Sequence, residues 1–541
     1  MTRSNQPLYF LLLAIIGLSA CSKRFTHTVR QVPQPAAHTS NTPNYTDSTI
    51  TVAAGTHYDR SGLHTFFYGK HYRAAWATPV TVPVLDIGTA HGGLKPTGLG
   101  GSRQTISLRL EDSTGTQYVL RSLDKEPASA LSEKLQQSYL ADVVRDATSA
   151  TNPYAALALP HMAKAIGIYH LEPELVYVPH DPRLGKYKDE VGGMLALLER
   201  HPSDNQSDYA PMGNAEKVKS SRSAIEERLK DNDSYFDARA FLRARLFDML
   251  IGDWSRHEDN WRWAELPYQD KAYTYKPIPR DRDNIFYKID DGPLLWTLQR
   301  FGVKSHFQTF KPHISAKQLE KLNTSGRNLD ELILTQLQWQ DWQEIADSVQ
   351  QALTDKVIDE AFTAMPEPIA NLYASQLGSN LKSRRNDLPQ MARNYYETLS
   401  REVQVVGTDK HERFEVEVLD NGDVRVQVYK TQKDGDVEQR IYDRLFHAKE
   451  TKQLELYGLN GEDHFILSGK ALPKLKIKIW GGASEDSYKT KGDKLGKNIY
   501  IHDTLYRNEL DVSKSTHVEL DNDQKAQTFD AEGWLLRYYL D

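Results

Sequence analysis

The chain of 541 residues contains a single cysteine, Cys21. One cysteine excludes disulfides within the chain, and it excludes metal sites that need several thiolates. The fold must therefore be held together by packing and hydrogen bonds. Hydrophobic residues make up 39% of the chain and charged residues 26%, which is typical of a globular protein, and the length suffices for two to four domains.

An export signal precedes this cysteine. Arg3 is followed by an apolar run over residues 8–18 and by the small residues Ser19 and Ala20, which is the pattern of a secretory signal peptide. The run is shorter than the roughly 20 residues that cross a bilayer as a helix, and the sequence contains no second segment suited to cross one. We therefore predict a signal peptide over residues 1–20.

The end of this signal, residues 18–21, resembles the lipobox of bacterial lipoproteins. In that family the cysteine sulfur carries a diacylglycerol and the freed amine is acylated, so several chains such as palmitate anchor the protein. The resemblance implies a lipid on Cys21. Ser22 in place of an aspartate favours the outer membrane, with the periplasmic or surface face left open. The alternative is an ordinary signal peptide with a coincidental cysteine.

The net charge of the chain limits the kinds of partner that it is expected to bind. The formal net charge is −6, from 67 basic and 73 acidic residues. Proteins that bind nucleic acid carry a basic patch or an excess of positive charge, so no nucleic-acid partner is expected. The expected partner is the membrane, through the lipid on Cys21, and a protein or glycan partner stays unidentified.

The chain divides into segments of different composition and periodicity. The predicted segments are a signal peptide (1–20), a disordered tether (21–56), an α/β body (57–313), a helical continuation (314–404) and a β-rich domain (405–541). The tether is rich in Thr, Pro, Ser, Asn and Gln and lacks periodic apolar residues. The expected fold class is α+β, with a C-terminal antiparallel β domain.

Local patterns support this division. Residues 105–110 and 117–121 alternate as two strands around a polar turn, and apolar residues over 238–250 fall on one helical face. Asn421 and Gly422 stand between two alternating runs, a strong signal of a two-residue hairpin. The sequence shows no long internal repeats.

Two polar loops follow the expected helix over residues 238–250. The first loop carries Asp253, Ser255, His257, Asp259 and Asn260, and the second carries Asp281 and Asp283. Kinase-type phosphotransfer needs this order of groups. One loop supplies a carboxylate that orients the acceptor hydroxyl and an Asn for metal, and the next supplies a metal-binding Asp.

The first loop resembles the Asp-x-His-x-x-Asn loop of atypical kinase-like proteins, a group that includes the spore-coat kinase CotH, the HipA toxins and the phosphoinositide kinases. His257 and Asn260 match its His and Asn, and Asp281 with Asp283 resembles its later metal-binding motif. The resemblance implies a two-lobed kinase-like body that binds Mg²⁺ with ATP through Asn260, Asp281 and Asp283. The chain also resembles envelope proteins of the Bacteroidetes.

Upstream residues occur in the order that this resemblance implies. Gly100 and Gly101 lie where a kinase places its phosphate-covering loop, and Arg121 lies where the phosphate-binding lysine is expected. The expected strand that ends at Glu199 corresponds to the one that leads to the adenine-binding hinge. The resemblance thus implies cofactor-binding roles for Gly100, Gly101, Arg121 and Glu199.

The loop departs from the family at its first position. Ser255 replaces the catalytic Asp, and a hydroxyl cannot accept a proton at neutral pH or hold metal well. Asp253 and Asp259 are the candidate substitutes, and we assign catalytic roles to Asp253, Ser255 and His257. Arg121 in place of Lys keeps the charge but is bulkier. A pseudokinase therefore remains an alternative.

Each feature also has a structural explanation. The glycine-rich stretch could be an ordinary loop, and His257 could be a structural histidine. Asp281 and Asp283 could simply form surface ion pairs with Arg280 and Arg282, which stabilise little. The ordered combination of these features, rather than any one of them, indicates a kinase-like cleft.

The β-rich domain contains two glycine-rich turns that begin 23 residues apart, at Gly458 and Gly481. Both approximate the calcium-binding nonapeptide of RTX proteins, with Asp463 and Asp486 as the carboxylates. Stacked β-helices need about three or more contiguous repeats. We therefore favour the alternative, two Gly-Asp turns between strands of a sandwich, and keep Ca²⁺ as a possible ligand of this domain.

Three functions are compatible with these features. The first is an envelope-anchored kinase-like phosphotransferase with Asp253, Asn260, Asp281 and Asp283 at its centre. The second is a degenerate kinase-like protein that serves as a surface binding or scaffold lipoprotein. The third is a hydrolase of phosphate esters or glycans, although the histidines do not cluster as a metallophosphatase needs, and two unplaced carboxylates do not identify a glycosidase.

Overall fold

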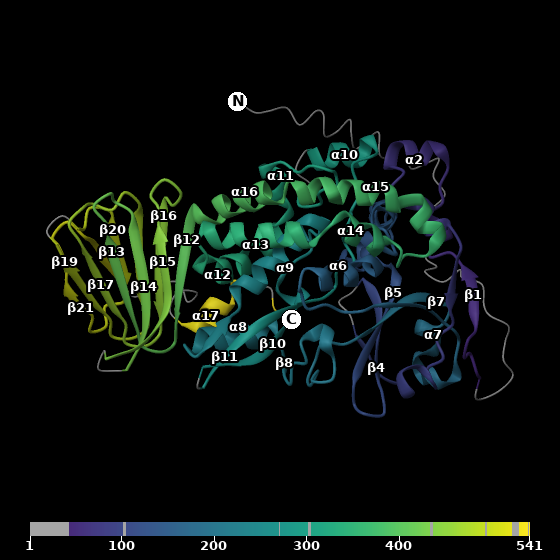
Figure 1. Cartoon of the computed structure of the whole chain (residues 1–541), viewed down its shortest axis with the longest axis horizontal. Coiled ribbons are helices and arrows are strands. Elements are labelled where there is room, and N and C mark those ends of the chain that lie inside the picture. The colour runs from purple at the N-terminus through teal and green to yellow at the C-terminus, as the bar shows by residue number, and fades with distance from the viewer. Residues whose placement is uncertain are drawn as a thin grey trace.

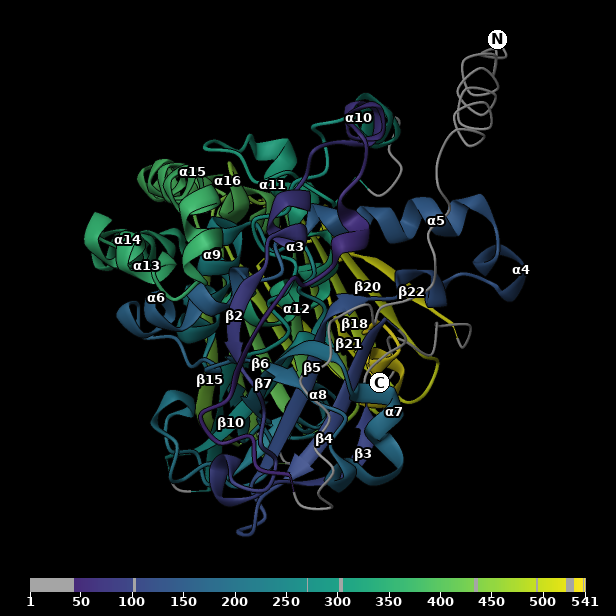
Figure 2. The same ribbon diagram turned by 90° about the vertical axis from the view of Figure 1, so that its right-hand side faces the viewer.

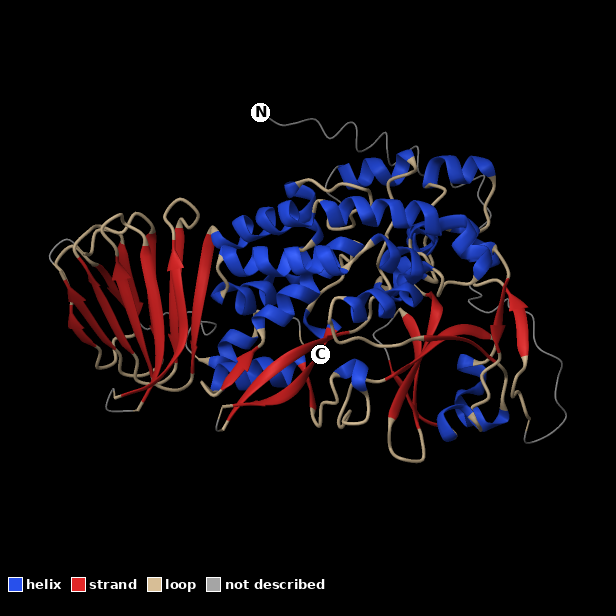
Figure 3. Ribbon diagram, in the orientation of Figure 1, coloured by secondary structure: helices blue, strands red, loops and turns tan. Residues whose placement is uncertain are grey.

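The computed structural model describes residues 43–100, 104–269, 271–300, 305–432, 436–492, 495–521, 530–538 and 540. Cys21, the signal peptide, most of the tether and Gly101 lie outside the described residues. A mixed body of helices and sheets adjoins a C-terminal β domain, which lies at the left of Figures 1 and 3. Among the described residues, no helix is long and apolar enough to cross a membrane.

A five-stranded antiparallel sheet forms the N-terminal part of the body, with the order β3-β4-β5-β7-β6. Its strands are β3 (Lys95–Gly100), β4 (Thr105–Glu111), β5 (Gln117–Lys125), β6 (Glu174–Val178) and β7 (Met194–Arg200). The predicted hairpin over residues 105–121 is confirmed as β4 and β5. One face of the sheet packs on its own hydrophobic core around Leu108, Leu120 and Leu198.

A smaller sheet lies beside it, with the order β8-β10-β11-β9. Its strands are β8 (Val218–Ser220), β9 (Ser234–Phe236), β10 (Trp261–Tyr268) and β11 (Ala272–Pro279), and a separate pair joins β1 (Thr49–Val52) to β2 (Val80–Pro83). Trp261 and Trp263 on β10 are fully buried in the main hydrophobic core. They therefore pack the interior and are not a ligand platform.

The helix α9 (Ala238–Ile251) supports both polar loops. It begins at Asp237, whose side chain accepts the Ala240 N–H, and it ends at Gly252, which adopts the left-handed conformation of a C-terminal cap. The predicted helix over residues 238–250 is thereby confirmed. Most of its side chains are buried, so the loop that follows starts from a fixed point of the core.

The body contains further helices before and after α9 in the sequence. Between the first strands and α9 they are α2 (Gly62–Tyr68), α3 (Arg73–Ala77), α4 (Glu133–Gln136), α5 (Tyr139–Asp146), α6 (Leu159–Ala165), α7 (Lys188–Val191) and α8 (Ser221–Lys230). After it come α10 (Pro293–Arg300), α11 (Ala316–Leu322), α12 (Arg327–Ile333), α13 (Trp339–Ala352), α14 (Asp355–Phe362), α15 (Glu367–Asn386) and α16 (Leu388–Ser400). Figure 2 shows α13, α14, α15 and α16 grouped above and to one side of β4 and β5.

The C-terminal domain differs from the expected antiparallel arrangement, so that prediction is wrong. One sheet, β12-β16-β18-β20-β22, is entirely parallel, and in the other, β15-β14-β13-β17-β19-β21, only the β13–β14–β15 meander is antiparallel. The strands are β12 (Glu402–Thr408), β13 (Glu412–Val418), β14 (Val424–Thr431), β15 (Val437–Phe446), β16 (Gln453–Leu459), β17 (His464–Gly469), β18 (Lys476–Gly482), β19 (Ser487–Lys491), β20 (Ile499–Asp503), β21 (Glu509–Asp511) and β22 (His517–Leu520), followed by α17 (Ala531–Leu535). The predicted Asn421-Gly422 hairpin is confirmed between β13 and β14.

The parallel strands form stacked coils, which corrects our expectation that the chain has no repeats. Ser487 lies opposite His464, 23 residues earlier, and Glu509 lies opposite Ser487, 22 residues earlier. A hydrophobic core around Phe414 and Phe465 fills the space between the two sheets. The domain therefore combines the two layers of a sandwich with the parallel stacking of a solenoid.

The turns between coils explain the two Gly-Asp motifs. Asp463 Oδ1 accepts the Glu412 N–H at 2.7 Å, Asp486 Oδ1 accepts the Asp463 N–H at 2.8 Å, and Asn508 Oδ1 accepts the Asp486 N–H at 2.8 Å. Each side chain thus holds the backbone of the preceding coil. Among the described residues, no group of three or more His, Cys, Asp or Glu side chains is arranged to hold a metal ion. These aspartates therefore act here as backbone clamps between coils.

Candidate functional site

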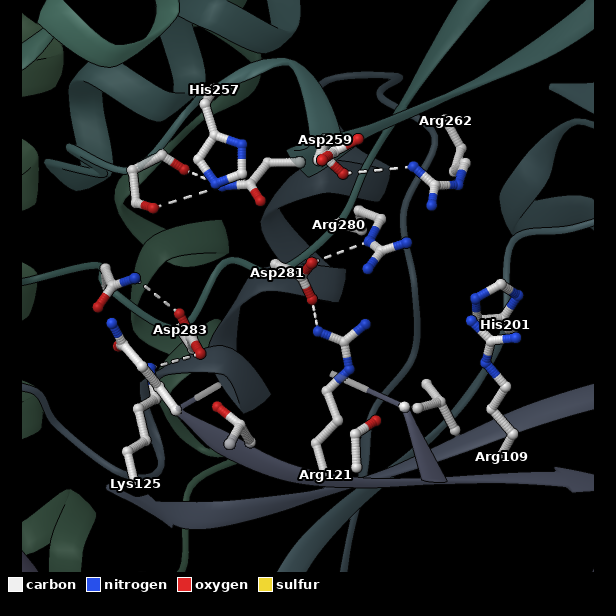
Figure 4. A pocket seen from close by; sticks show the side chains of 18 of the residues that line it. Arg109, Arg121, Lys125, His201, His257, Asp259, Arg262, Arg280, Asp281 and Asp283 are labelled. Carbon is white, nitrogen blue, oxygen red and sulfur yellow. Dashed lines mark hydrogen bonds and ion pairs between the residues drawn. The ribbon is translucent and has the colours of Figure 1, made fainter. Parts of the chain in front are cut away.

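A cleft of about 650 Å³ lies between the N-terminal sheet and the two polar loops (Figure 4). Its lining comes from β3, β4, β5, β8, β10, the segment after β7, the loop after α9 and the loop after β11. The lining residues are Gly100, Gln104, Thr105, Ser107, Arg109, Val119, Arg121, Lys125, His201, Ser220, Trp254, Ser255, His257, Asp259, Asn260, Arg262, Arg280, Asp281, Asp283 and Asn284. Segments that are far apart in the sequence therefore meet at one site.

The sheet forms one wall of the cleft. Side chains of a strand point alternately to its two faces. On β4, Ser107 and Arg109 line the cleft while Leu108 and Leu110 enter the core. On β5, Arg121 lines the cleft, as does Lys125 at the end of the strand. The alternation places a row of polar and basic groups over the loops.

One buried carboxylate, Asp248 on α9, fixes the two loops that form the opposite wall. Asp248 accepts from Arg256 Nε at 3.1 Å and from Arg282 Nε and Nη2 at 3.0 and 2.8 Å. Arg256 also donates to the backbone oxygens of Asn260, at 3.0 Å, and Arg280, at 2.8 Å. Because all three charged side chains are buried, this network holds the first and second loops in one relative position.

Ion pairs join the two walls. Lys125 Nζ on β5 lies 2.6 Å from Asp283 Oδ2 in the second loop. Arg121, also on β5, pairs with Asp281, and its Nε lies 3.3 Å from Glu199 Oε1 on β7. Figure 4 shows both carboxylates pointing toward the basic groups of the sheet. Asp281 also pairs with Arg280 of its own loop, but both Asp281 and Asp283 reach across the cleft to a basic residue of the sheet.

The cleft carries more positive than negative charge. Five basic residues line it, Arg109, Arg121, Lys125, Arg262 and Arg280, against three acidic ones, Asp259, Asp281 and Asp283. Burial, together with the positive charges of Arg121 and Arg262, lowers the pKa of Arg280 to about 9. Burial and four neighbouring arginines lower the pKa of His201 to about 3. This repulsion among cations marks a site that an anion would stabilise.

Asp253 does not line the cleft. It is fully buried beneath the first loop, where its Oδ1 accepts the Ser255 N–H at 3.0 Å, and its Oδ2 lies 3.6 Å from Arg256 Nη1. Burial raises the pKa of the Asp253 carboxyl to about 7. In the first loop, Asp259 is the carboxylate that lines the cleft, together with Ser255 and His257.

The other residues predicted for the site lie in or beside the cleft. Gly100, Arg121, Asn260, Asp281 and Asp283 all line the cleft. The Asn260 side chain donates to the backbone oxygen of Ser255, so it also braces its own loop. Glu199 lies just behind Arg121 and lines a smaller adjoining cavity, where burial raises its pKa.

Sequence reasoning missed four basic residues that line the cleft. Lys125, Arg109 and Arg262 were not singled out, and Arg280 was treated as a partner in a surface ion pair. The alternation along β4 could have identified Arg109, because it lies on the strand face opposite the core residues Leu108 and Leu110. Arg262 carries the same signal, because it lies between the buried Trp261 and Trp263 on β10, but which surface that strand face lines depends on the pairing of β10 with β11 and β8.

The acidic residues fit a cation that takes few protein ligands. Among the described residues, no cluster of three His, Cys, Asp or Glu side chains could hold a metal without further ligands. Mg²⁺ usually binds one or two carboxylates together with substrate phosphates and water. Asp281 and Asp283 supply that number, provided that their present partners, Arg121 and Lys125, release them.

No family model matches the chain, and no curated protein matches it. Several solved structures are distantly similar to it. They include the proinflammatory kinase CtkA of Helicobacter pylori, with 14% identity over 56% of this chain and 95% of that chain and a TM-score of 0.31. The Rio2 kinase of Chaetomium thermophilum covers 55% of this chain and 71% of its own, with 11% identity and a TM-score of 0.24. The amicoumacin kinase hAmiN covers 55% and 88%, with 12% identity and a TM-score of 0.16. Similarity at this level carries no functional inference.

Proposed function

We propose that the protein is an outer-membrane lipoprotein whose kinase-like cleft binds a phosphorylated ligand together with a divalent cation, and that it transfers phosphate slowly or not at all. One observation carries this proposal. The cleft brings Arg121, Lys125, Asp281 and Asp283 together as two ion pairs that join its opposite walls.

Each ion pair contains both groups that such a ligand needs. Lys and Arg bind phosphate oxygens through charge-assisted hydrogen bonds, and Asp binds Mg²⁺. A phosphate group with a bound divalent cation can therefore exchange partners with the resting pairs. Lys125 and Arg121 turn to the phosphate, and Asp283 and Asp281 turn to the cation.

The cleft contains the groups needed to bind phosphate, but it lacks the usual carboxylate for phosphoryl transfer. Phosphoryl transfer needs a carboxylate that orients the acceptor hydroxyl. Ser255 cannot serve, and Asp253 is buried away from the cleft with a pKa near neutrality. Asp259 is the remaining carboxylate of that loop in the cleft, so we assign it the role that was predicted for Asp253.

The release of inorganic phosphate from ATP with Mg²⁺ tests this assignment. We expect slow turnover by the wild type, a further loss in Asp259→Asn and a gain in Ser255→Asp. Ser375→Asp, on the exposed surface of α15, is the matched control and should leave turnover unchanged. Rapid wild-type turnover that survives Asp259→Asn would show that the catalytic group lies elsewhere.

The second candidate is a non-enzymatic binding or scaffold lipoprotein. It is favoured by the same departure at Ser255, because a cleft that retains its phosphate-binding cations without an acceptor-orienting carboxylate can bind without reacting. The stacked C-terminal coils would then supply a further surface for a protein or glycan partner. A Ser255→Asp variant that binds ligand but gains no turnover would favour this candidate.

The lipid anchor has its own test. Mass spectrometry of the membrane-fraction protein should find an acylated N-terminus at Cys21, and Cys21→Ala should release the protein from membranes. The wild-type protein in the same fractionation is the control. An unmodified N-terminus, or one at another residue, would refute the anchor without affecting the cleft.

A further inference from the structure

We propose that the end of the cleft formed by Arg109, His201, Arg262 and Arg280, here called the basic end, is a second anion subsite. The ligand then carries phosphate groups at both ends of the cleft and no purine ring. This inference rests on the proposed function, because it assumes that the end near Lys125 and Asp283 binds phosphate.

The basic end is assembled from four separate segments. Arg109 lies on β4, Arg262 on β10 and Arg280 directly after β11, while His201 follows β7. In Figure 4, Arg109, His201 and Arg262 lie at the opposite side of the pocket from Lys125 and Asp283. The pKa of His201 is lowered by all three of these arginines as well as by Arg121, which agrees with their proximity.

The arginines of the basic end have few acidic partners. Among the described residues, no carboxylate lies within 4.0 Å of the Arg109 or Arg262 guanidinium. Arg262 Nη1 instead donates to the backbone oxygens of Trp261, at 2.8 Å, and Asp259, at 3.3 Å. Arg280 Nε donates to Asp281 Oδ2 at 2.8 Å, but Asp281 also pairs with Arg121. Asp281 therefore serves two guanidinium groups, and the charge of Asp259 offsets only part of the burial of Arg262 and Arg280, whose pKa values stay lowered.

This excess of positive charge at the basic end has an energetic cost. Partly buried like charges repel each other, and the desolvation of Arg262 and Arg280 adds to that cost, as their lowered pKa values indicate. A bound anion offsets both penalties, because guanidinium groups bind phosphate bidentately and its negative charge compensates theirs. The arrangement is therefore suited to a ligand with several negative charges rather than to a single phosphate.

The basic end also occupies the place where the kinase resemblance implied adenine. The expected hinge strand is β7, and His201 follows it directly. Sites for flat organic rings are lined predominantly by apolar and aromatic side chains. In this cleft, Val119 and Trp254 are the apolar side chains among the described lining residues. The lining therefore favours phosphate groups over a nucleobase.

The fitting ligand is a small molecule with several phosphate groups. A linear polyphosphate and a polyphosphorylated sugar or cyclitol share this chemistry, and two probes distinguish them. Tripolyphosphate represents the linear form, and inositol hexakisphosphate represents the cyclic form. ATP and adenosine test for the nucleobase, and pyrophosphate tests for binding at the Lys125 end alone.

Isothermal titration of the full-length mature protein in detergent with Mg²⁺ tests the inference. We expect tripolyphosphate or inositol hexakisphosphate to bind at least as tightly as ATP, and adenosine not to compete. Arg109→Gln and Arg262→Gln should each weaken binding of the tighter probe about tenfold and leave pyrophosphate binding unchanged. Arg239→Gln, which removes an arginine from a surface ion-pair cluster on α9, is the matched control and should change neither.

The outcomes separate the inference from the proposed function. If pyrophosphate binds and depends on Lys125, but Arg109→Gln and Arg262→Gln have no effect, the second subsite is refuted and the proposed function stands. If adenosine competes, or ATP binds more than tenfold tighter than tripolyphosphate, a nucleobase site is present and the inference is wrong. If no phosphate compound binds the wild type, both fail.

Discussion

Lys125 Nζ on β5 lies 2.6 Å from Asp283 Oδ2 in the loop that follows β11. This ion pair connects the N-terminal sheet to the opposite wall of the cleft, and Asp283 keeps 39% of its side chain exposed. The pair is therefore accessible to a competing ligand from solvent. A phosphate group competes for the lysine, whereas a divalent cation competes for the aspartate.

Lys125→Met should consequently change two affinities in opposite directions. Removal of the ammonium frees Asp283, so the affinity for Mn²⁺ alone should rise, while the affinity for pyrophosphate with Mg²⁺ should fall by about tenfold or more. Titration calorimetry measures both. Lys382→Met, which removes a surface partner of Asp359, should change neither affinity, and a parallel fall of both affinities would contradict an exchange of partners.

Asp248 should be necessary for stability, although it lies outside the cleft. Its carboxylate receives Arg256 and Arg282, and all three side chains are buried. Asp248→Asn leaves buried cations without their counter-charge, so we expect the free energy of unfolding to fall by about 3–5 kcal/mol. Urea denaturation measures the change.

The control for this variant is Asp359→Asn, at an exposed ion pair, which should shift stability by no more than about 0.5 kcal/mol. An Asp248→Asn protein as stable as this control would mean that the loops are held by other contacts.

The C-terminal domain should become less stable as the pH rises. Burial, and then the charges of neighbouring carboxylates, raise the pKa of Asp463 and of Asp486 well above the ordinary value, and burial raises that of Asp503 to about 6. The folded domain therefore binds more protons than the unfolded chain between a pH of about 4, the pKa of an unfolded Asp, and the raised pKa values of the folded domain. Stability is highest in acid and decreases as the pH rises through the folded pKa values.

Asp486→Asn isolates this effect. Asn keeps an oxygen that accepts the Asp463 N–H, and Asn508 already fills the corresponding position of the next coil. We expect a higher melting temperature at pH 8 and a smaller difference between pH 5 and pH 8. Asp511→Asn, on the exposed strand β21, is the control. A variant that melts at a lower temperature than the wild type at pH 8 would show that the charged carboxylate is needed.

The sequence predicts best what is encoded locally. The helix α9 follows from apolar periodicity, and the β13–β14 hairpin follows from the turn residues Asn421 and Gly422. The sequence does not reveal the parallel pairing, because the paired residues are 17 to 51 positions apart and the two glycine-rich turns differ too much to show the repeat. Strand alternation alone cannot reveal which strands are neighbours.

The candidate site also has one part that local sequence predicts and another that depends on the folded chain. The order of the two loops predicted which segments form the cleft, and Asn260, Asp281 and Asp283 do line it. The burial of Asp253 could not be read from the loop, because it depends on the arginines that contact Asp248. The excess of basic residues was also missed, since it arises from strands β4, β5 and β10 that meet only in the folded chain.

The most direct test of the central claim is calorimetric titration of pyrophosphate into the mature protein, with and without Mg²⁺, for the wild type and for Asp283→Asn. Asp359→Asn is the control. The account predicts Mg²⁺-dependent binding to the wild type and to the control, and binding about tenfold weaker or absent in Asp283→Asn. Equal binding by all three proteins, or binding that does not respond to Mg²⁺, would contradict a phosphate- and metal-binding cleft at Lys125 and Asp283.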